Sequence, residues 1–296
     1  MKNVSRKHHY LPEHYLEGFT NHENVFYVYD KKTQKIFPTN PNGAFFENDL
    51  NTVTFPDGSS SDFLEGLYTK MENQHWGPFD RIRQSTAAAP VHLLDKMHVF
   101  MFLMFLYWRT PSRIGAVEEL SAHAFLDDND IDFFKLVNKA GQKAPQEVAQ
   151  VLRQSQAFKK SLKQIAPLMP FVKDKEWGAR VDEWRLLYTE DDSSWFIVGD
   201  DPIVVRDENV SLVNPLKEFV FPLSGRMVLV NTEKKVAERL PREFVTKFDT
   251  AIIERAQRFV ACRNREFLEA LIRYHGVYVS YGKTDMIIPE VFGMLA

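Results

Sequence analysis

The pattern of apolar and polar positions along this chain changes twice, and the changes divide it into three stretches. Over residues 1–58, aromatic and β-branched residues alternate with polar ones between turn residues, as in short antiparallel strands. Over residues 60–175 the apolar positions recur at helical spacing, and over residues 180–296 strand-like runs return with Gly and Pro between them. No long polar linker separates the stretches. We therefore predict a single α+β domain, in which a helical middle packs against a mostly antiparallel sheet.

Turn and capping residues place the individual elements. We expect a short helix over residues 12–17 and a hairpin formed by residues 25–30 and 35–37. Further helices are predicted over residues 62–84, 91–108, 111–126, 130–140, 145–165, 241–261 and 264–273. Further strands are predicted over residues 184–189, 195–198, 203–206, 219–221, 226–230 and 277–280. The helix over 91–108 is apolar nearly all round, so we expect it to be buried on every side.

The composition argues against polyanion-binding, membrane-spanning and disulfide-bonded classes of protein. The net charge of -3 over 296 residues does not mark the whole molecule as a binder of polyanions. The longest apolar run, residues 99–108, is too short for a bilayer span of roughly 20 residues, and residues 1–20 lack the apolar core of a signal peptide. A single cysteine, Cys262, excludes an intramolecular disulfide, and its apolar helical setting predicts an inert buried thiol. We expect a cytoplasmic protein without a membrane partner.

The first 20 residues hold the densest group of side chains that could carry chemistry. His8 and His9 are candidates for a general base or a metal ligand, and Tyr10 is a candidate binding residue. In an extended segment His8 and Tyr10 point to one side and His9 to the other, so the two imidazoles chelate one ion only if the chain turns there. The alternative is that one imidazole is a satisfied core or capping group and the other is exposed.

Three charged residues elsewhere are candidates for the same site. Asp200 and Asp201 follow directly on an apolar strand, where a carboxylate can project into a ligand crevice, and Asp200 is the candidate metal ligand together with His9. The alternative is a structural Asp-Pro turn. Arg109 ends the central helix and could grip a phosphate, or could pair with a buried carboxylate. If these groups form a site, His8, Arg109 and Asp200 should lie close together.

Two helices carry a carboxylate three residues before a histidine. Glu72 precedes His75, and Asp95 precedes His98, which is the spacing that di-iron bundles use. The two further Glu-bearing helices of such bundles are missing here, so this pattern is the weaker of the metal hypotheses; Glu72 is a candidate binding residue. Residues 148–173 contain five Lys or Arg and no Asp or Glu. Such a strip is a solvated helix face or a set of phosphate contacts.

Five short motifs together resemble a known family. They are the opening H-H-Y-L-P-x-x-Y-L-x-x-F from His8, the strand at residues 25–30, Arg109-Thr110-Pro111, Gly199-Asp200-Asp201-Pro202 and Phe221-Pro222-Leu223-Ser224. In this order they are similar to an uncharacterised microbial family, domain of unknown function 4238, from about residue 8 to about residue 230. The family usually has a small or amide residue between the Asp and the Pro, whereas this chain has Asp201. The resemblance implies the unity of the fold and the choice of candidate residues, but no reaction.

The absence of several known motifs excludes the classes of enzyme that depend on them. The chain has no P-loop, no G-x-G-x-x-G, no G-x-S-x-G, no H-E-x-x-H and no zinc-type Cys/His spacing, so we expect no nucleotide cofactor. The remaining His, Asp, Arg and Tyr residues suit a metal-dependent phosphodiesterase or nuclease that uses Mg²⁺ or Mn²⁺ and acts on nucleic acid. By analogy, such a hydrolase would belong to a microbial conflict or phage-defence system, with a partner protein from the same operon. The alternative is a non-catalytic ligand- or protein-binding module of such a system. The oligomeric state is left open.

Overall fold

The computed structural model describes most of the chain, and three groups of elements make up this part. The described residues are 6–54, 58–85, 91–113, 117, 122, 141–142, 145–165, 181, 184–190, 193–206, 216, 218–232 and 236–295. The helices are α1 (Glu13–Leu16), α2 (Phe63–Arg83), α3 (Leu93–Arg109), α5 (Gln146–Gln154), α6 (Gln156–Ile165), α8 (Arg242–Arg255), α9 (Arg265–Ser280) and α10 (Ile287–Met294). Short 3₁₀ turns are η1 (Glu17–Phe19), η2 (Pro41–Gly43), η3 (Pro111–Arg113) and η5 (Thr284–Met286). The predicted helices over 111–126 and 130–140 lie largely or wholly outside the described residues.

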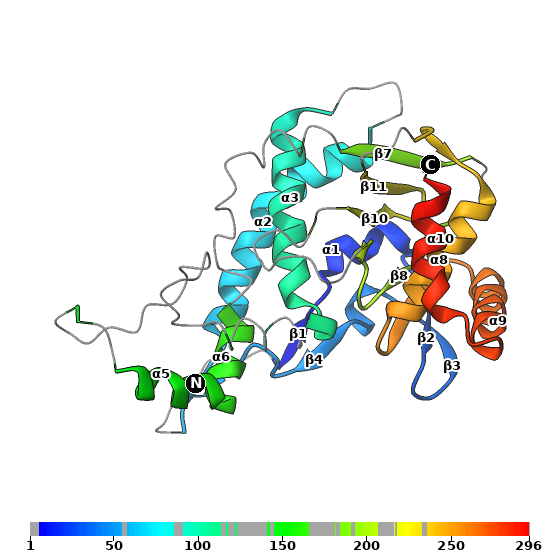
Figure 1. Cartoon of the computed structure of the whole chain (residues 1–296). Helices are drawn as coiled ribbons and strands as arrows, with labels where there is room; N and C mark the ends of the chain where they lie inside the picture. The colour runs from blue at the N-terminus through cyan, green and yellow to red at the C-terminus, as the bar shows by residue number, and fades with distance from the viewer. Residues whose placement is uncertain are drawn as a thin grey trace.

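The strands form two larger sheets and two small ladders (Figure 1). The strands are β1 (Lys7–His9), β2 (Phe26–Asp30), β3 (Lys35–Thr39), β4 (Phe46–Asn48), β5 (Val53–Thr54), β6 (Ser60–Ser61), β7 (Arg185–Thr189), β8 (Val198–Gly199), β9 (Val204–Val205), β10 (Phe219–Ser224), β11 (Met227–Asn231), β12 (Arg239–Leu240) and β13 (Phe259–Cys262). One sheet has the order β12-β7-β11-β10-β9, in which β12 and β7 run parallel and the other neighbours antiparallel. The other, β3-β2-β13-β8, is antiparallel throughout. The fold is therefore α+β, as the sequence predicts.

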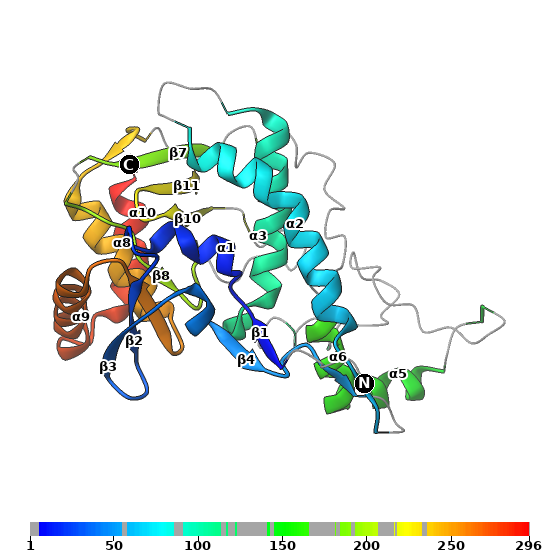
Figure 2. The ribbon, with the colours of Figure 1, turned by 180° about the vertical axis from the view of Figure 1, so that it is seen from behind.

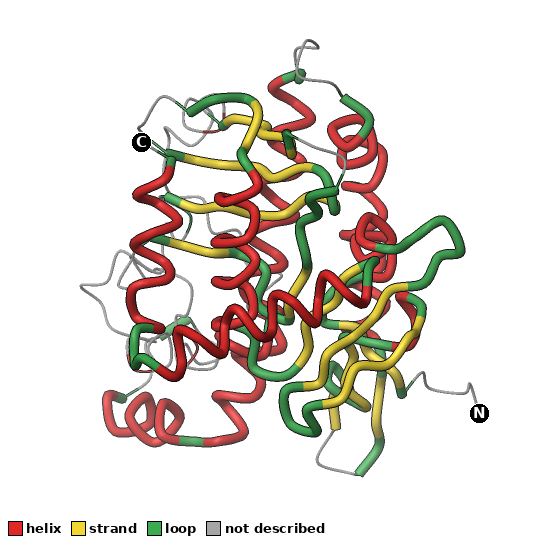
Figure 3. Tube along the Cα trace, turned by 90° about the vertical axis from the view of Figure 1, so that its right-hand side faces the viewer, coloured by secondary structure: helices red, strands yellow, loops and turns green. Residues whose placement is uncertain are grey.

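Alternating side chains of the strands divide the apolar core into two clusters. In β10, Phe219 and Phe221 join the cluster that contains α3, whereas Val220 between them joins the cluster that contains Phe244 of α8. Because successive side chains of a strand point to opposite faces, one sheet separates the two clusters. The views from the front and from behind place α2 and α3 on one side of the strands and α8 and α10 on the other (Figures 1 and 2). Figure 3 looks at the second side, where helices lie across the strands.

The helix pair α2–α3 agrees closely with the sequence pattern. From Val99 to Arg109 every residue of α3 except Met101 is buried. The expected burial on every side is wrong for the first turn, where Leu93 and Leu94 are exposed. The predicted helix over 145–165 is two helices, α5 and α6, because Ser155 between them has an extended backbone. Among the described residues, none of the helices combines the length and the apolar character that crossing a membrane requires.

The predicted closing elements are wrong in two places. The helix expected over 241–261 ends at Arg255, and Phe259–Cys262 forms β13, a central strand buried on both faces. Cys262 therefore lies on a strand and not on a helix, although it is buried as expected and burial raises its pKa to about 12. The strand expected over 277–280 is the last part of α9. No neighbouring strand pairs with this segment in the described part of the chain, so a helix satisfies its backbone groups.

Candidate functional site

The two histidines of the opening motif lie on β1 and point in opposite directions. β1 pairs antiparallel with β4, and His8 is fully buried while the backbone N–H of Asn51 donates to its Nδ1 at 2.8 Å. His9 faces the other side, with its Nδ1 3.5 Å from the Glu13 carboxylate. Its Nε2 is buried and, within the described residues, has no hydrogen-bond partner. Burial lowers the pKa of His9, a shift that Glu13 opposes, so the ring is neutral at pH 7.

Arg109 connects this motif to helix α2. Its guanidinium donates to the Glu72 carboxylate and to the backbone carbonyl of His9, and lies 3.8 Å from the Glu65 carboxylate. Burial raises the pKa of Glu72, while the charge of Arg109 opposes the shift. Glu65 in turn accepts a hydrogen bond from the Asn51 side chain at 2.8 Å. His8, His9, Glu72 and Arg109 thus lie in one network, in which Asn51 and Glu65 are the linking residues.

Asp200 has a different set of partners. Its carboxylate accepts three backbone N–H groups, from Gln257 at 2.8 Å, Arg258 at 2.7 Å and Phe259 at 2.9 Å. Burial raises the pKa of Asp200, and the three N–H donors oppose the shift because they stabilise the charged form. Asp200 therefore fixes the turn between α8 and β13. Tyr10 is buried, and burial together with the nearby charge of Asp200 raises the pKa of its hydroxyl.

Asp201 bridges two buried arginines. Its carboxylate lies 3.0 Å from Nη2 of Arg113 and 2.5 Å from Nη2 of Arg255. The Arg113 guanidinium also lies 4.3 Å from the centre of the Tyr107 ring. The repulsion expected between two adjacent carboxylates is thus relieved by arginines at Asp201 and by backbone donors at Asp200. The prediction that His8, Arg109 and Asp200 converge holds for the first two, whereas Asp200 belongs with Asp201 to a second polar cluster.

The carboxylate–histidine spacings on α2 and α3 do bring two imidazoles together. Nδ1 of His75 lies 3.2 Å from Nδ1 of His98, and burial together with the neighbouring ring lowers the pKa of His75 to about 4. The carboxylates take other partners: Glu72 binds Arg109, and Asp95 binds Arg81. Among the described residues, no group of three or more His, Cys, Asp or Glu side chains is arranged to hold a metal ion.

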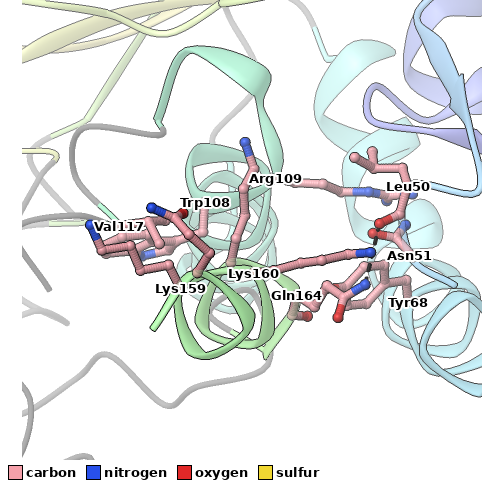
Figure 4. Close-up of a pocket in the computed structure, with 11 residues that line it drawn as sticks. Leu50, Asn51, Tyr68, Trp108, Arg109, Val117, Lys159, Lys160 and Gln164 are labelled. Carbon is pink, nitrogen blue, oxygen red and sulfur yellow. Dashed lines mark hydrogen bonds between the residues drawn. The ribbon is translucent and has the colours of Figure 1, made fainter. Parts of the chain in front are cut away.

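A cavity beside α6 has three lysines in its lining (Figure 4). It has a volume of about 250 Å³ and is lined by Leu50, Asn51, Tyr68, Trp108, Arg109, Val117, Gln156, Lys159, Lys160, Lys163 and Gln164. Trp108 and Val117 lie at one end and Leu50, Asn51 and Tyr68 at the other. The side chains of Lys159, Lys160 and Lys163 form neither ion pairs nor hydrogen bonds with the part of the chain that the structure describes. Burial lowers the pKa of Lys163, a shift that the charge of Glu47 opposes.

Hydrogen bonds fix α6 against the rest of the cavity wall. The Tyr68 hydroxyl donates to the backbone carbonyl of Gln164. The Gln164 side chain donates to the carbonyl of Thr52 at 3.2 Å and, in a longer contact of 3.4 Å, to that of Leu50. Sequence reasoning missed Tyr68, Trp108 and Gln164 as lining residues. The basic strip over 148–173 was the one signal that pointed to this side of the molecule.

Comparisons with known proteins give one match. A family model described as "Protein of unknown function (DUF4238)" matches residues 7–266. Neither the search of curated proteins nor the search of solved structures returned a match. The motifs noted in the sequence fall within the matched range, and any functional conclusion has to come from the geometry.

Proposed function

Because this chain belongs to the family of proteins of unknown function DUF4238, which carries no activity to transfer, we propose from the geometry that it binds a small phosphate-containing ligand in the cavity beside α6. The observation that supports this most is the set of three lysines, Lys159, Lys160 and Lys163, which line the cavity and whose side chains form no ion pair within the described residues. Three neighbouring cations repel one another unless an anion lies between them. A bound phosphate would supply that anion.

The walls of the cavity favour a ligand that is part apolar. Leu50, Trp108 and Val117 contribute apolar surface, and a cavity of about 250 Å³ has the size of a small organic molecule. Apolar walls lower the local dielectric constant, so each lysine attracts an anion more strongly than it would in open water. Arg109 belongs both to the cavity wall and to the His9 network, which places the opening motif next to the ligand.

A second candidate function is cleavage of a phosphoester at His9, which lies outside the cavity lining and is linked to it through Arg109. The observation that favours it is the buried Nε2 of His9, which has no partner among the described residues, on a ring that is neutral at pH 7. A neutral imidazole can accept a proton from an attacking water. A metal-dependent phosphodiesterase or nuclease with Mg²⁺ or Mn²⁺, working in a microbial conflict or phage-defence system beside a partner protein, is the specific form of this proposal. It rests on residue chemistry and analogy.

Binding can be tested with AMP and inorganic pyrophosphate in isothermal titration calorimetry. The double variant Lys159→Gln, Lys160→Gln should bind either probe about tenfold or more weakly, because each charged contact to a phosphate contributes roughly 1.5 to 3 kcal/mol. Lys70→Gln is the control, because Lys70 is exposed on α2 and does not line the cavity. Equal affinities of the double variant and the wild type would contradict the proposal, and so would a wild-type protein that binds neither probe.

Cleavage is tested separately with bis-p-nitrophenyl phosphate in the presence of Mn²⁺. If His9 is the general base, His9→Gln should lower the rate by about 10²-fold or more. The variant should keep its affinity for AMP, since His9 does not line the cavity. Absence of hydrolysis by the wild type, together with tight AMP binding, would leave the ligand-binding function and remove the hydrolase.

A further inference from the structure

Lys163 lies on α6 in the wall of the cavity. It is partly buried, whereas Lys160 is exposed, and within the described residues it has neither an ion pair nor a hydrogen bond. Lys159 and Lys160 precede it by four and three residues on α6, so both lie beside it on the same helix surface. The side chain thus stands in the wall of a cavity with two cations as neighbours.

Burial favours the neutral amine at this position. Burial disfavours the charged ammonium and lowers the pKa of Lys163, with Glu47 opposing. Lys159 and Lys160 on α6 and Arg109 on α3 line the same cavity, so its wall carries several cationic groups beside Lys163. A lysine that is desolvated and placed next to other cations is the setting in which proteins obtain a nucleophilic amine.

We propose that Lys163 forms a Schiff base with an aldehyde or ketone that carries a phosphate group, and that Lys159 and Lys160 hold the phosphate. This inference rests on the proposed function, because it requires a phosphate-bearing ligand in the same cavity. It adds the chemical class of that ligand, a phosphorylated carbonyl compound, and a covalent role for one residue.

The step is a condensation with a simple balance of atoms. The lone pair of the Lys163 Nζ attacks the carbonyl carbon, a C–N bond forms and the carbonyl π electrons move to oxygen. Protons move from nitrogen to that oxygen, which leaves as water when the C=N bond forms. No oxidant, reductant or metal is needed, and hydrolysis reverses the step. The phosphate remains intact.

Pyridoxal 5′-phosphate is a suitable probe, because it carries an aldehyde and a phosphate on one small ring. The wild-type protein is incubated with it, reduced with borohydride and digested, and the labelled lysines are located by mass spectrometry. We expect Lys163 to be labelled about tenfold or more faster than the exposed Lys70. Equal labelling of Lys163 and Lys70 would overturn the inference. This experiment needs no variant, so misfolding cannot obscure it.

Two controls separate this inference from the proposed function. Pyridoxine 5′-phosphate has an alcohol in place of the aldehyde, so it can occupy the phosphate site without forming a Schiff base. The variant Lys163→Arg keeps the positive charge and should bind pyridoxine 5′-phosphate with an affinity within about threefold of wild type, while losing the pyridoxal adduct in the α6 peptide. Binding of pyridoxine 5′-phosphate without a pyridoxal adduct at Lys163 would refute only the covalent role. Failure of the wild type to bind pyridoxine 5′-phosphate would refute both.

Discussion

At the scale of single residues, the Asp201 carboxylate forms ion pairs with two buried arginines. Arg113 and Arg255 each place one guanidinium nitrogen on one of its oxygens, and all three side chains are at most 7% exposed. Removing one partner of a buried ion pair leaves an uncompensated charge, which costs much more than the loss of a pair on the surface. The three residues therefore act as one unit.

Asp201→Ala should lower the free energy of unfolding by about 3 to 5 kcal/mol, because it leaves both guanidinium groups without their carboxylate. Urea denaturation followed by circular dichroism measures the change. The control is Arg265→Ala, which breaks the exposed Arg265–Glu269 pair and should change the free energy of unfolding by at most about 0.5 kcal/mol. Similar losses in the two variants would mean that the Asp201 cluster carries no special stability.

Asp249 predicts a dependence of stability on pH. It is fully buried, one oxygen accepts the backbone N–H of Ile197 at 3.1 Å, and the other has no partner in the described part of the chain. Burial raises the pKa of Asp249 well above its usual value. The unfolded chain releases this proton near pH 4, whereas the folded chain keeps it to higher pH, so the contribution of Asp249 to stability is present below pH 4 and is lost as the pH rises.

Asp249→Asn cannot ionise, so the stability of the wild type relative to this variant should fall as the pH rises above about 4. Urea denaturation at a series of pH values tests this. A difference between the wild type and Asp249→Asn that does not change with pH would show that Asp249 is charged in the folded state.

The contribution of Asp30 to stability depends on pH in the opposite direction. Burial raises the pKa of Asp30, but hydrogen bonds from Arg258 and from the backbone of Lys32 lower it overall. Its contribution is present above the usual pKa and is lost as the pH falls.

The candidate site could be predicted from the sequence only in part, for a physical reason. Alternation along an extended segment correctly separated His8 from His9, because that rule is local. The partners of Asp200 are backbone N–H groups of residues 257–259, which lie far along the chain and carry no sequence signature. The cavity beside α6 likewise depends on how α2, α3 and α6 meet, and a basic strip alone cannot distinguish a cavity wall from a solvated face.

At the scale of elements, the close approach of β8 to α8 requires a glycine. A Cβ atom built on Gly199 would lie 2.9 Å from the Ile252 side chain and 3.3 Å from the Ile252 carbonyl. Gly199→Ala should therefore push β8 away from α8 and lower the free energy of unfolding by about 1 to 3 kcal/mol. Thermal melts measure the effect.

Gly66→Ala is the matched control for this change. A Cβ at Gly66 would meet nothing within 4 Å, and Gly66 lies inside α2, where alanine has the higher helix propensity. This variant should stabilise the protein by about 0.4 to 1 kcal/mol. If both alanine variants shift the melting temperature in the same direction, the contact between β8 and α8 is looser than described.

Sequence patterns predicted elements well where one local signal dominates. The helices α2 and α3 have a long helical repeat of apolar positions, and the β2–β3 hairpin has a polar turn. In these elements the local sequence pattern and the tertiary packing favour the same structure, so the pattern was enough to predict them. β13 was missed because a central strand buried on both faces shows an apolar run without alternation, which resembles the end of a helix. The β-branched residues Val277 and Val279 suggested a strand, but they continue α9, whose Leu268 and Leu271 anchor it in the core.

At the scale of the whole molecule, the two ends of the sequence are interleaved. β2 near the start pairs with β13 near the end, in a register that joins Val28 to Ala261. The Lys31 side chain donates to the carbonyls of Ile253 at 2.8 Å and Ala256 at 2.6 Å, at the end of α8. The Tyr15 hydroxyl on α1 donates to the carbonyl of Pro222 in β10 at 2.8 Å. The amino-terminal segments are thus fixed to β10 and to the end of α8 by residues more than 200 positions away along the chain.

This interleaving predicts that the chain unfolds as one cooperative unit. Circular dichroism at helix wavelengths and tryptophan fluorescence should give coincident thermal transitions, because the sheet β3-β2-β13-β8 takes its strands from the start, the middle and the end of the chain. Tyr15→Phe leaves the buried Pro222 carbonyl without its donor, which costs about 1 to 3 kcal/mol, and should move both transitions down together by several degrees. The transitions measured by fluorescence and by circular dichroism could instead differ in the wild type, or only one of them could shift in Tyr15→Phe. Either result would mean that the amino-terminal segments form an independent unit. The cavity that they help to line could then open without global unfolding.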